Sequence, residues 1–144
     1  MRQRVGVLLT RTRAGVRELL VLDCPQGCGL EPPGGGIEPG ESPEAAALRE
    51  VAEETGLHEI AVLGRLGESE ILDAGTPVRT LWVHAELHGD APDAWDHVVE
   101  GDGGDAGLVH PLRWLPLPLA EPLAPGHDAM LAALPDDDPE RWMR

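Results

Sequence analysis

The 144-residue chain contains no lysine, asparagine, phenylalanine or tyrosine. It also lacks any long apolar run, so we expect no segment of it to span a membrane. The N-terminal region has no sustained apolar stretch followed by a small-residue cleavage site, which argues against a signal peptide and favours a cytoplasmic location. The length is typical of a single domain, which we assign to residues 1–144, with 135–144 as a C-terminal tail or last turn.

Positive charge is also scarce. The chain has 11 basic residues, all arginine, against 26 acidic ones, and its net charge is -15. So acidic a protein is not expected to bind a long nucleic acid polymer, because that requires basic side chains opposite the phosphates. A small phosphorylated substrate remains compatible with this charge if a metal ion screens the site.

The chain has only two cysteines, Cys24 and Cys28. Two cysteines separated by three residues are half of a zinc site, but there is no second pair and no histidine close by in sequence, so zinc is disfavoured. A disulfide is disfavoured in a cytosolic protein. We therefore interpret both residues as thiols of a loop beside the binding cleft.

A glycine- and proline-rich loop followed by an acidic helix is the most informative feature that is present. Residues 33–36 and 39–40 are strong turn formers. Ser42 is a good N-cap, Pro43 fits the first helical position, and Gly56 can adopt the left-handed conformation that ends a helix. The sequence therefore predicts a helix over residues 42–55.

Three carboxylates, those of Glu50, Glu53 and Glu54, fall within about 100° of arc on this helix, because an α-helix turns roughly 100° per residue. Small and apolar residues such as Leu48 and Ala52 fall opposite, so we expect one face to pack on a core and the other to present the acids. Like charges at these spacings destabilise a helix. We therefore expect a hard divalent cation among them, Mg²⁺ above all, held against a phosphate chain.

The segment resembles the signature of the Nudix hydrolase family at every fixed position. The matching residues are Gly35, Glu41, Arg49-Glu50-Val51, Glu53-Glu54 and Gly56-Leu57. Residues 30–34 resemble the usual lead-in, and residues 113–117 resemble the family's last strand. The resemblance implies an α/β (α+β) fold, an α/β/α sandwich with a mixed β-sheet. It also implies a Mg²⁺-dependent hydrolase, with Mn²⁺ as a substitute, in which water attacks phosphorus in the pyrophosphate linkage of a nucleoside triphosphate or nucleoside diphosphate derivative.

The resemblance also assigns metal ligands. Glu50 and Glu54 are the principal ligands that it implies. Glu53 is a third ligand or the general base, and the carbonyl of Gly34 could complete the inner shell.

Four further residues are candidates for catalytic or supporting roles. The resemblance pairs Arg49 with Glu41, which would hold the loop against the helix, whereas the plainer interpretation is a surface ion pair of little value. Many family members take another carboxylate from a downstream loop, and in residues 89–106 we favour Glu100. His97 beside it could act as a base, but a loop histidine is more often only exposed.

The substrate is not identified by the sequence. The tyrosine associated with dinucleoside polyphosphates in the family is absent, because the chain has no tyrosine. A base would need another flat surface to stack on, and we name Trp82 and Trp95 as candidates. Trp114 is interpreted as a core residue.

The remaining chain predicts a mixture of strands and one more helix. We expect strands at 5–10, 18–22, near 30, 60–66, 68–73, 78–87 and 108–115, a loop at 89–106, and a C-terminal helix at 128–134.

Two other functions stay open at this point. One is a non-catalytic nucleotide-binding or regulatory module on the same fold, although such modules usually have lost a signature glutamate that this chain retains. The other is an acidic cation-binding domain, but the 89–106 loop lacks the ligand spacing of calcium sites. A homodimer is common in the family, and nothing in the sequence decides it.

Overall fold

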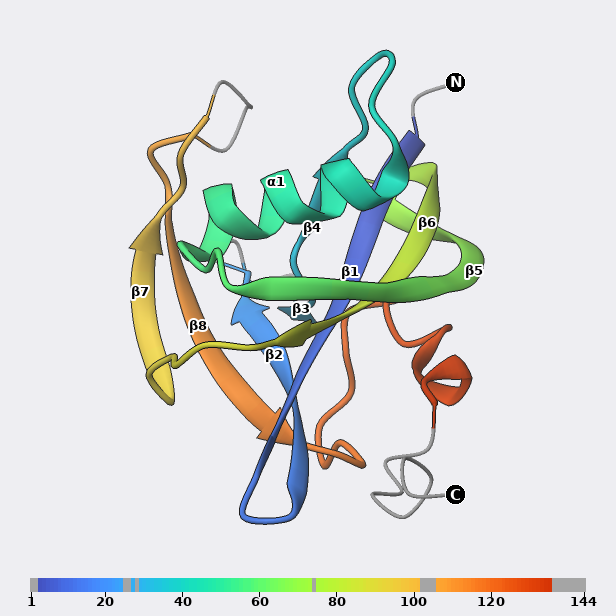
Figure 1. Cartoon of the computed structure of the whole chain (residues 1–144). Coiled ribbons are helices and arrows are strands. Elements are labelled where there is room, and N and C mark those ends of the chain that lie inside the picture. The colour runs from blue at the N-terminus through green and yellow to red at the C-terminus, as the bar shows by residue number, and fades with distance from the viewer. Residues whose placement is uncertain (1–2, 25–26, 28, 74, 102–105, 136–144) are drawn as a thin grey trace.

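The computed structural model describes residues 3–24, 27, 29–73, 75–101 and 106–135. The elements, drawn in Figure 1, are β1 (Gln3–Arg13), β2 (Val16–Asp23), β3 (Leu30–Glu31), β4 (Gly34–Gly36), α1 (Pro43–Thr55), β5 (Ile60–Asp73), β6 (Thr76–Leu87), β7 (Ala94–Val98), β8 (Val109–Pro116) and the 3₁₀ helix η1 (Leu131–Ala133). Within the described residues, no helix combines the length and the apolar composition needed to span a bilayer.

The strands form one mixed sheet in the order β5-β6-β1-β2-β8-β7, with β3 paired to β2 and β4 paired to β1. The β1–β6 pairing is parallel, whereas β1–β2, β2–β8 and β7–β8 are antiparallel. This arrangement confirms the predicted α+β class with a mixed sheet.

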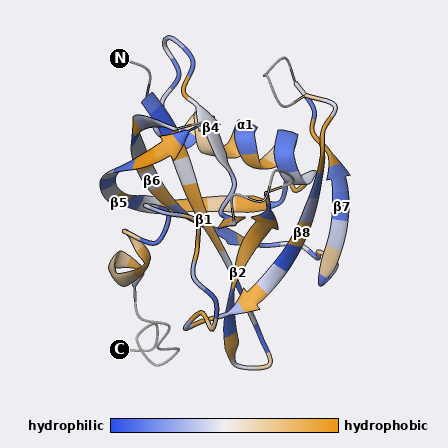
Figure 2. Cartoon of the chain, turned by 180° about the vertical axis from the view of Figure 1, so that it is seen from behind, coloured by the Kyte–Doolittle hydropathy of each residue, from blue (hydrophilic) through white to orange (hydrophobic). Residues whose placement is uncertain are grey.

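Alternation along the central strands gives the sheet two apolar faces, because successive side chains of a strand point to opposite sides. We call the first the helix face: Val5, Val7 and Leu9 of β1 pack there with α1. We call the second the C-terminal face: Leu8 and Trp82 pack there with the segment that follows β8. Figure 2 shows hydrophobic residues concentrated on β1 and β2, at the centre of the sheet.

The ends of α1 follow the local sequence. The Ser42 Oγ accepts a hydrogen bond from the Ala45 amide at 3.1 Å, and Pro43 occupies the first turn. At the other end Gly56 has a φ of 79°, a left-handed conformation that glycine adopts without strain, and its amide donates to the Ala52 carbonyl. The helix bounds therefore agree with the prediction to within a residue.

The strands differ from the prediction in two ways: β4 and β7 were not predicted, and two predicted strands form a single strand in the structure. β4 lies inside the predicted glycine-rich turn, where residues 34–36 pair with β1. β7 lies inside the predicted 89–106 loop and pairs with β8. The strands expected at 60–66 and 68–73 are one strand, β5, which follows β6 through irregularities between Val62 and Gly64 and between Arg65 and Gly67. The β4–β1 pairing joins segments about 30 residues apart in sequence, so the local sequence around 34–36 does not reveal it.

The C-terminal region differs from the prediction in its type of helix. Residues 128–134 were expected to form an α-helix, but the structure has only η1, over Leu131–Ala133. This segment is short and bounded by Pro125-Gly126 and Pro135, and it is held to the sheet by apolar packing of Met130, Leu131 and Leu134. Apart from Pro135, the predicted tail at 135–144 lies outside the described residues.

The cysteine prediction also needs correction. Cys24 is disulfide-bonded in the structure, and not a free thiol. It lies directly after β2, where its amide donates to the Gly29 carbonyl at 3.0 Å and its carbonyl accepts from the Gly27 amide. Cys28 lies outside the described residues.

Candidate active site

Two of the signature carboxylates lie on the packed face of α1. Glu50 and Glu54 are only 9% and 4% exposed, and they share this face with Val51. Leu48, which was expected on the packed side, is 42% exposed. The prediction that the acids and the buried face lie on opposite sides was therefore wrong. The reason is tertiary: the glycine strand β4 contacts α1 and covers its acidic side.

Glycine is required in β4 because the glutamates lie directly against the backbone. A Cβ placed on Gly35 would lie 2.3 Å from the Glu50 Cδ, so no larger residue fits without moving that carboxylate. The amide of Gly34 donates to the Glu54 Oε1 at 3.2 Å. Gly34 is thus next to the acids, as expected, although the contact seen here is made by its amide and not by its carbonyl.

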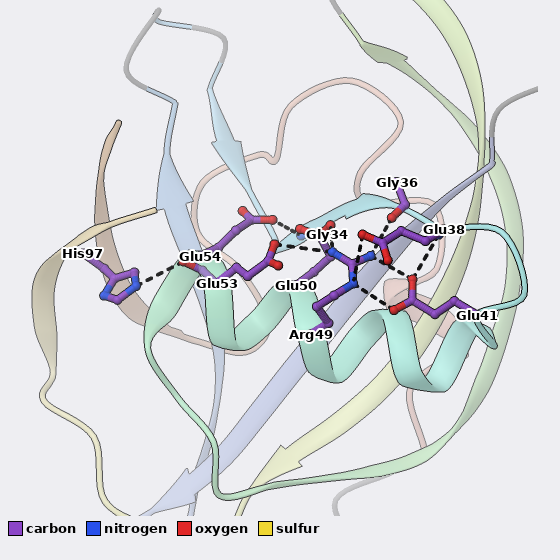
Figure 3. Close-up of polar contacts among 9 residues, drawn as sticks. All are labelled: Gly34, Gly36, Glu38, Glu41, Arg49, Glu50, Glu53, Glu54 and His97. Atoms are coloured by element: carbon purple, nitrogen blue, oxygen red, sulfur yellow. Dashed lines mark hydrogen bonds and ion pairs between the residues drawn. The ribbon is translucent and has the colours of Figure 1, made fainter. Parts of the chain in front are cut away.

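Arg49 joins the loop to the helix. Its Nε and Nη2 donate to the two oxygens of Glu41, both at 2.8 Å, and Nη2 also donates to the Gly36 carbonyl at 2.9 Å (Figure 3). The remaining nitrogen, Nη1, donates to Glu50 at 2.9 Å and to Glu53 at 3.4 Å. The two-pronged hydrogen bond from Arg49 lowers the pKa of Glu41 to about 2. The pair is therefore connected through Arg49 to Glu50, Glu53 and the glycine strand, and is not an isolated surface contact.

Burial raises the pKa of Glu50 above its ordinary value, and the hydrogen bonds from Arg49 and with Glu54 only partly oppose this effect. A cation bound beside Glu50 would favour the charged form that burial disfavours. Carboxylate oxygens are the ligands that hard divalent cations prefer, so the donor set fits Mg²⁺ or Mn²⁺. Among the described residues, no three His, Cys, Asp or Glu side chains already surround a common point.

The strand β7 holds the last turn of α1. The Nε2 of His97 donates to the Glu53 carbonyl at 3.1 Å, and the Glu100 amide donates to the same oxygen at 3.0 Å. The Nε1 of Trp95 donates to the Thr55 carbonyl at 3.0 Å. Because a carbonyl only accepts, the Nε2 of His97 carries its hydrogen and cannot at the same time act as a base. The side chain of Glu100 is 72% exposed, and its Oε1 lies 4.0 Å from the His97 Nε2.

The three tryptophans named in the sequence analysis differ in their surroundings in the structure. Trp82 is 1% exposed and packs in the core of the C-terminal face, so its ring offers no open surface to a base, which corrects the stacking prediction. Trp95 is half-buried against the helix face and next to α1. Trp114 is 7% exposed, as expected for a core residue, and the Arg11 guanidinium stacks on it at 4.4 Å.

His110 is a site residue that the sequence reasoning missed. It lies on β8 directly opposite His97 of β7, and its Nδ1 is 3.7 Å from the Glu54 Oε2. Alternation along 108–115 could have predicted an inward side chain at 110. Its meeting with Glu54 could not be predicted, because that depends on where β8 lies relative to α1.

Known proteins share both the loop-helix segment and the sheet. A family model described as the NUDIX domain matches residues 1–134. The chain therefore belongs to the Nudix domain family.

Two relatives match part of the chain. A Mycobacterium tuberculosis protein named "Putative 8-oxo-dGTP diphosphatase 2" is 44% identical over 88 residues, which cover 60% of this chain and 60% of the relative. An RNA pyrophosphohydrolase of Rhodospirillum rubrum is 43% identical over 63 residues, which cover 44% of this chain and 37% of that protein. The chain thus spans no more than 60% of the length of these curated relatives.

Solved structures share the fold. The crystal structure of a C. elegans Ap4A hydrolase has 23% identity and a TM-score of 0.57, over 79% of each chain. The NUDIX domain of Shewanella oneidensis NrtR complexed with ADP ribose has 23% identity and a TM-score of 0.60, over 91% of this chain and 82% of that one. At these identities the likeness concerns the fold alone.

Proposed function

We propose that this chain is a divalent-metal-dependent hydrolase that cleaves the pyrophosphate linkage of a nucleoside triphosphate or a nucleoside diphosphate derivative. The observation that carries the proposal is the buried pair Glu50 and Glu54, held against the backbone of Gly34 and Gly35 beside Arg49. The names of the diphosphatase and pyrophosphohydrolase relatives support the reaction class.

In this proposal Glu50 and Glu54 hold Mg²⁺ or Mn²⁺, with Glu53 as a third ligand and the Gly34 carbonyl as a further donor. When bound, the cation supplies positive charge that stabilises the negative charge developing on the phosphate oxygens. Arg49 and Glu41 keep the glycine strand against the helix, so that the donors are positioned before the substrate arrives.

Water must lose a proton when it attacks phosphorus, and two carboxylates are placed to accept it. Glu53 is held by Arg49 and is 26% exposed, whereas Glu100 is mostly exposed and tethered to Glu53 through its own amide. Comparing Glu53→Gln with Glu100→Gln at saturating metal assigns the base, because only the loss of the base removes the acidic limb of the pH–rate profile, where the rate rises as the base loses its proton.

The decisive test is product formation from a panel of nucleotides, with and without Mg²⁺ or Mn²⁺. The panel contains 8-oxo-dGTP, the unmodified triphosphates, nucleoside diphosphates, ADP-ribose, NADH, nucleotide sugars and dinucleoside polyphosphates. Metal-dependent cleavage that yields two phosphorylated products is the expected result. Nucleotide binding without cleavage of any member would replace the hydrolase by a non-catalytic binding module.

A further inference from the structure

Two buried side chains from distant parts of the chain meet beside the acidic pair. His110 of β8 and Glu54 of α1 have side chains that are 8% and 5% exposed, and the His110 Nδ1 lies 3.7 Å from the Glu54 Oε2. Burying a histidine beside a carboxylate removes both from water, and this cost is offset only if the two groups interact. The separation is longer than a normal hydrogen bond and short enough to close by a small side-chain movement.

The two oxygens of Glu54 face different partners. Oε1 accepts a hydrogen bond from the Gly34 amide, and Oε2 faces the imidazole. The carboxylate is thus held between the glycine strand on one side and β8 on the other. Rotation of the Glu54 carboxylate would break the hydrogen bond from Gly34 or move Oε2 away from His110. The two contacts together therefore define the plane of the carboxylate.

His97 provides an internal comparison. It lies directly opposite His110 in the β7–β8 pairing, on the same side of the sheet. Its Nε2 donates to a main-chain carbonyl of α1, so it acts on the helix backbone, whereas His110 faces a carboxylate side chain. The two histidines therefore contact the same helix in chemically different ways.

We propose that His110 is a positioning residue, whose Nδ1–H donates to the Glu54 Oε2 and fixes the orientation of that carboxylate for the divalent cation. The inference rests on the function proposed above and adds to it a residue outside the signature. Partners of this kind around metal-binding carboxylates typically change metal affinity by about 10- to 100-fold when they are removed.

Three substitutions test which atom matters. In His110→Asn the amide nitrogen can take the place of Nδ1, in His110→Gln it reaches toward Nε2 instead, and in His110→Leu neither donor remains. The readout is the Kd for Mn²⁺, measured by electron paramagnetic resonance on the folded protein without nucleotide. We expect His110→Leu and His110→Gln to weaken Mn²⁺ binding by about 10- to 100-fold, and His110→Asn to stay within about 3-fold of the parent chain.

His88 supplies a matched control. It also lies 3.7 Å from a glutamate oxygen, that of Glu86, but both side chains are about half exposed and lie on β6 and just beyond its end. His88→Leu should leave the Mn²⁺ Kd unchanged. The thermal unfolding midpoint of each variant shows whether weaker Mn²⁺ binding comes from a loss of folding. At saturating metal, the KM for the nucleotide should be unchanged in His110→Leu.

Three outcomes would overturn the inference. One is a Mn²⁺ Kd for His110→Leu equal to that of the parent chain. The second is rescue by glutamine in place of asparagine. The third is a nitrogen hyperfine coupling in the Mn²⁺ spectrum that disappears in His110→Leu, since this would make the imidazole a direct ligand. Failure of the proposed function is distinguishable, because then the parent chain itself would bind no Mn²⁺ and cleave no nucleotide.

Discussion

The two faces of the sheet are covered in different ways. On the helix face a regular helix brings Glu50 and Glu54 into the buried layer, against glycine backbone and near Arg49. On the C-terminal face an irregular segment with one short 3₁₀ helix covers a core that contains Trp82 and the buried His84. Both faces have an apolar core, and the buried carboxylates Glu50 and Glu54 lie on the helix face.

Under the proposed function, this difference separates the residues of the site from the residues that stabilise the fold. A buried carboxylate is a poor core component, because burial disfavours its charged form and so raises the pKa of Glu50. The buried indole of Trp82 is a good core component, because its Nε1 donates a hydrogen bond to the Ser69 Oγ. Substitutions of the buried acids, and of the glycines against them, should therefore affect activity more than folding, whereas substitutions in the core of the C-terminal face should do the reverse.

The largest effect is expected from Glu54→Gln. The substitution keeps the shape and the contact with Gly34 but removes the charge that the cation requires, so kcat should fall by roughly 1,000-fold, equal to several kcal/mol of transition-state stabilisation. The unfolding midpoint should stay close to that of the parent chain. Glu86→Gln, on an exposed strand position, is the control, and near-normal turnover by Glu54→Gln would refute the site assignment.

Two glycine substitutions compare the two faces directly. Gly35 lies against Glu50 on the helix face, and Gly6 lies against Trp82 on the C-terminal face. In Gly35→Ala the added Cβ displaces the flexible end of Glu50, so activity should fall by about 100-fold with little loss of stability. In Gly6→Ala the Cβ would lie 2.4 Å from the ring of Trp82, which is buried and cannot move away. That overpacking should cost about 1–3 kcal/mol of unfolding free energy.

Gly64→Ala is the control for both, since a Cβ there meets nothing within 4 Å. Steady-state kinetics and chemical denaturation of the three variants give the comparison. Equal losses of stability in Gly35→Ala and Gly6→Ala would remove the proposed division between the faces.

The third prediction concerns acid sensitivity. Burial, and then the nearby Arg17, lower the pKa of His84 to about 4, so between about pH 6.5 and pH 4 the unfolded chain takes up a proton that the folded chain does not. Folding stability should therefore fall as the pH falls through this window, by roughly 3 kcal/mol from this residue. Glu41, whose pKa is lowered to about 2, contributes fully to stability above about pH 4.5 and loses this contribution between about pH 4.5 and pH 2, so it does not affect the window above pH 4.5.

The measurement is the unfolding free energy across pH 4 to 8 for the parent chain and for His84→Gln, which can still bond Thr10. The variant should show a shallower slope between pH 6.5 and 4, with the remainder due to His127, whose pKa burial also lowers to about 4. Parallel curves for the two proteins would contradict a neutral, buried His84.

The smallest effect is expected at the exposed edge of the helix face. Arg65 of β5 pairs with Glu44 in the first turn of α1 at 2.9 Å, and both side chains are well exposed to solvent. Such pairs contribute little, because water and salt screen them. Arg65→Gln should leave the unfolding midpoint within about 1 °C and the kinetics unchanged. A clear loss of activity in Arg65→Gln would instead show that β5 helps to position α1 for the reaction.

Apart from β4, the loop and helix of residues 33–56 could be predicted because their signals are local. Ser42 and Gly56 cap the helix through bonds within a few residues, and the Arg49–Glu41 pair joins groups only eight residues apart. Trp82 could not be assigned from its residue type. An indole suits either a core or a stacking surface, and only burial against the C-terminal segment decides between them.

The signature spacing by itself determined the family, the capped helix and the set of carboxylates, because each depends on the order of neighbouring residues. Only the tertiary structure decided that Glu50 and Glu54 are buried and that His110 faces Glu54. The physical reason is that burial and long-range contact depend on which strands pair. The placement of β4 and β8 against α1 is set by packing over the whole sheet, and not by any one segment.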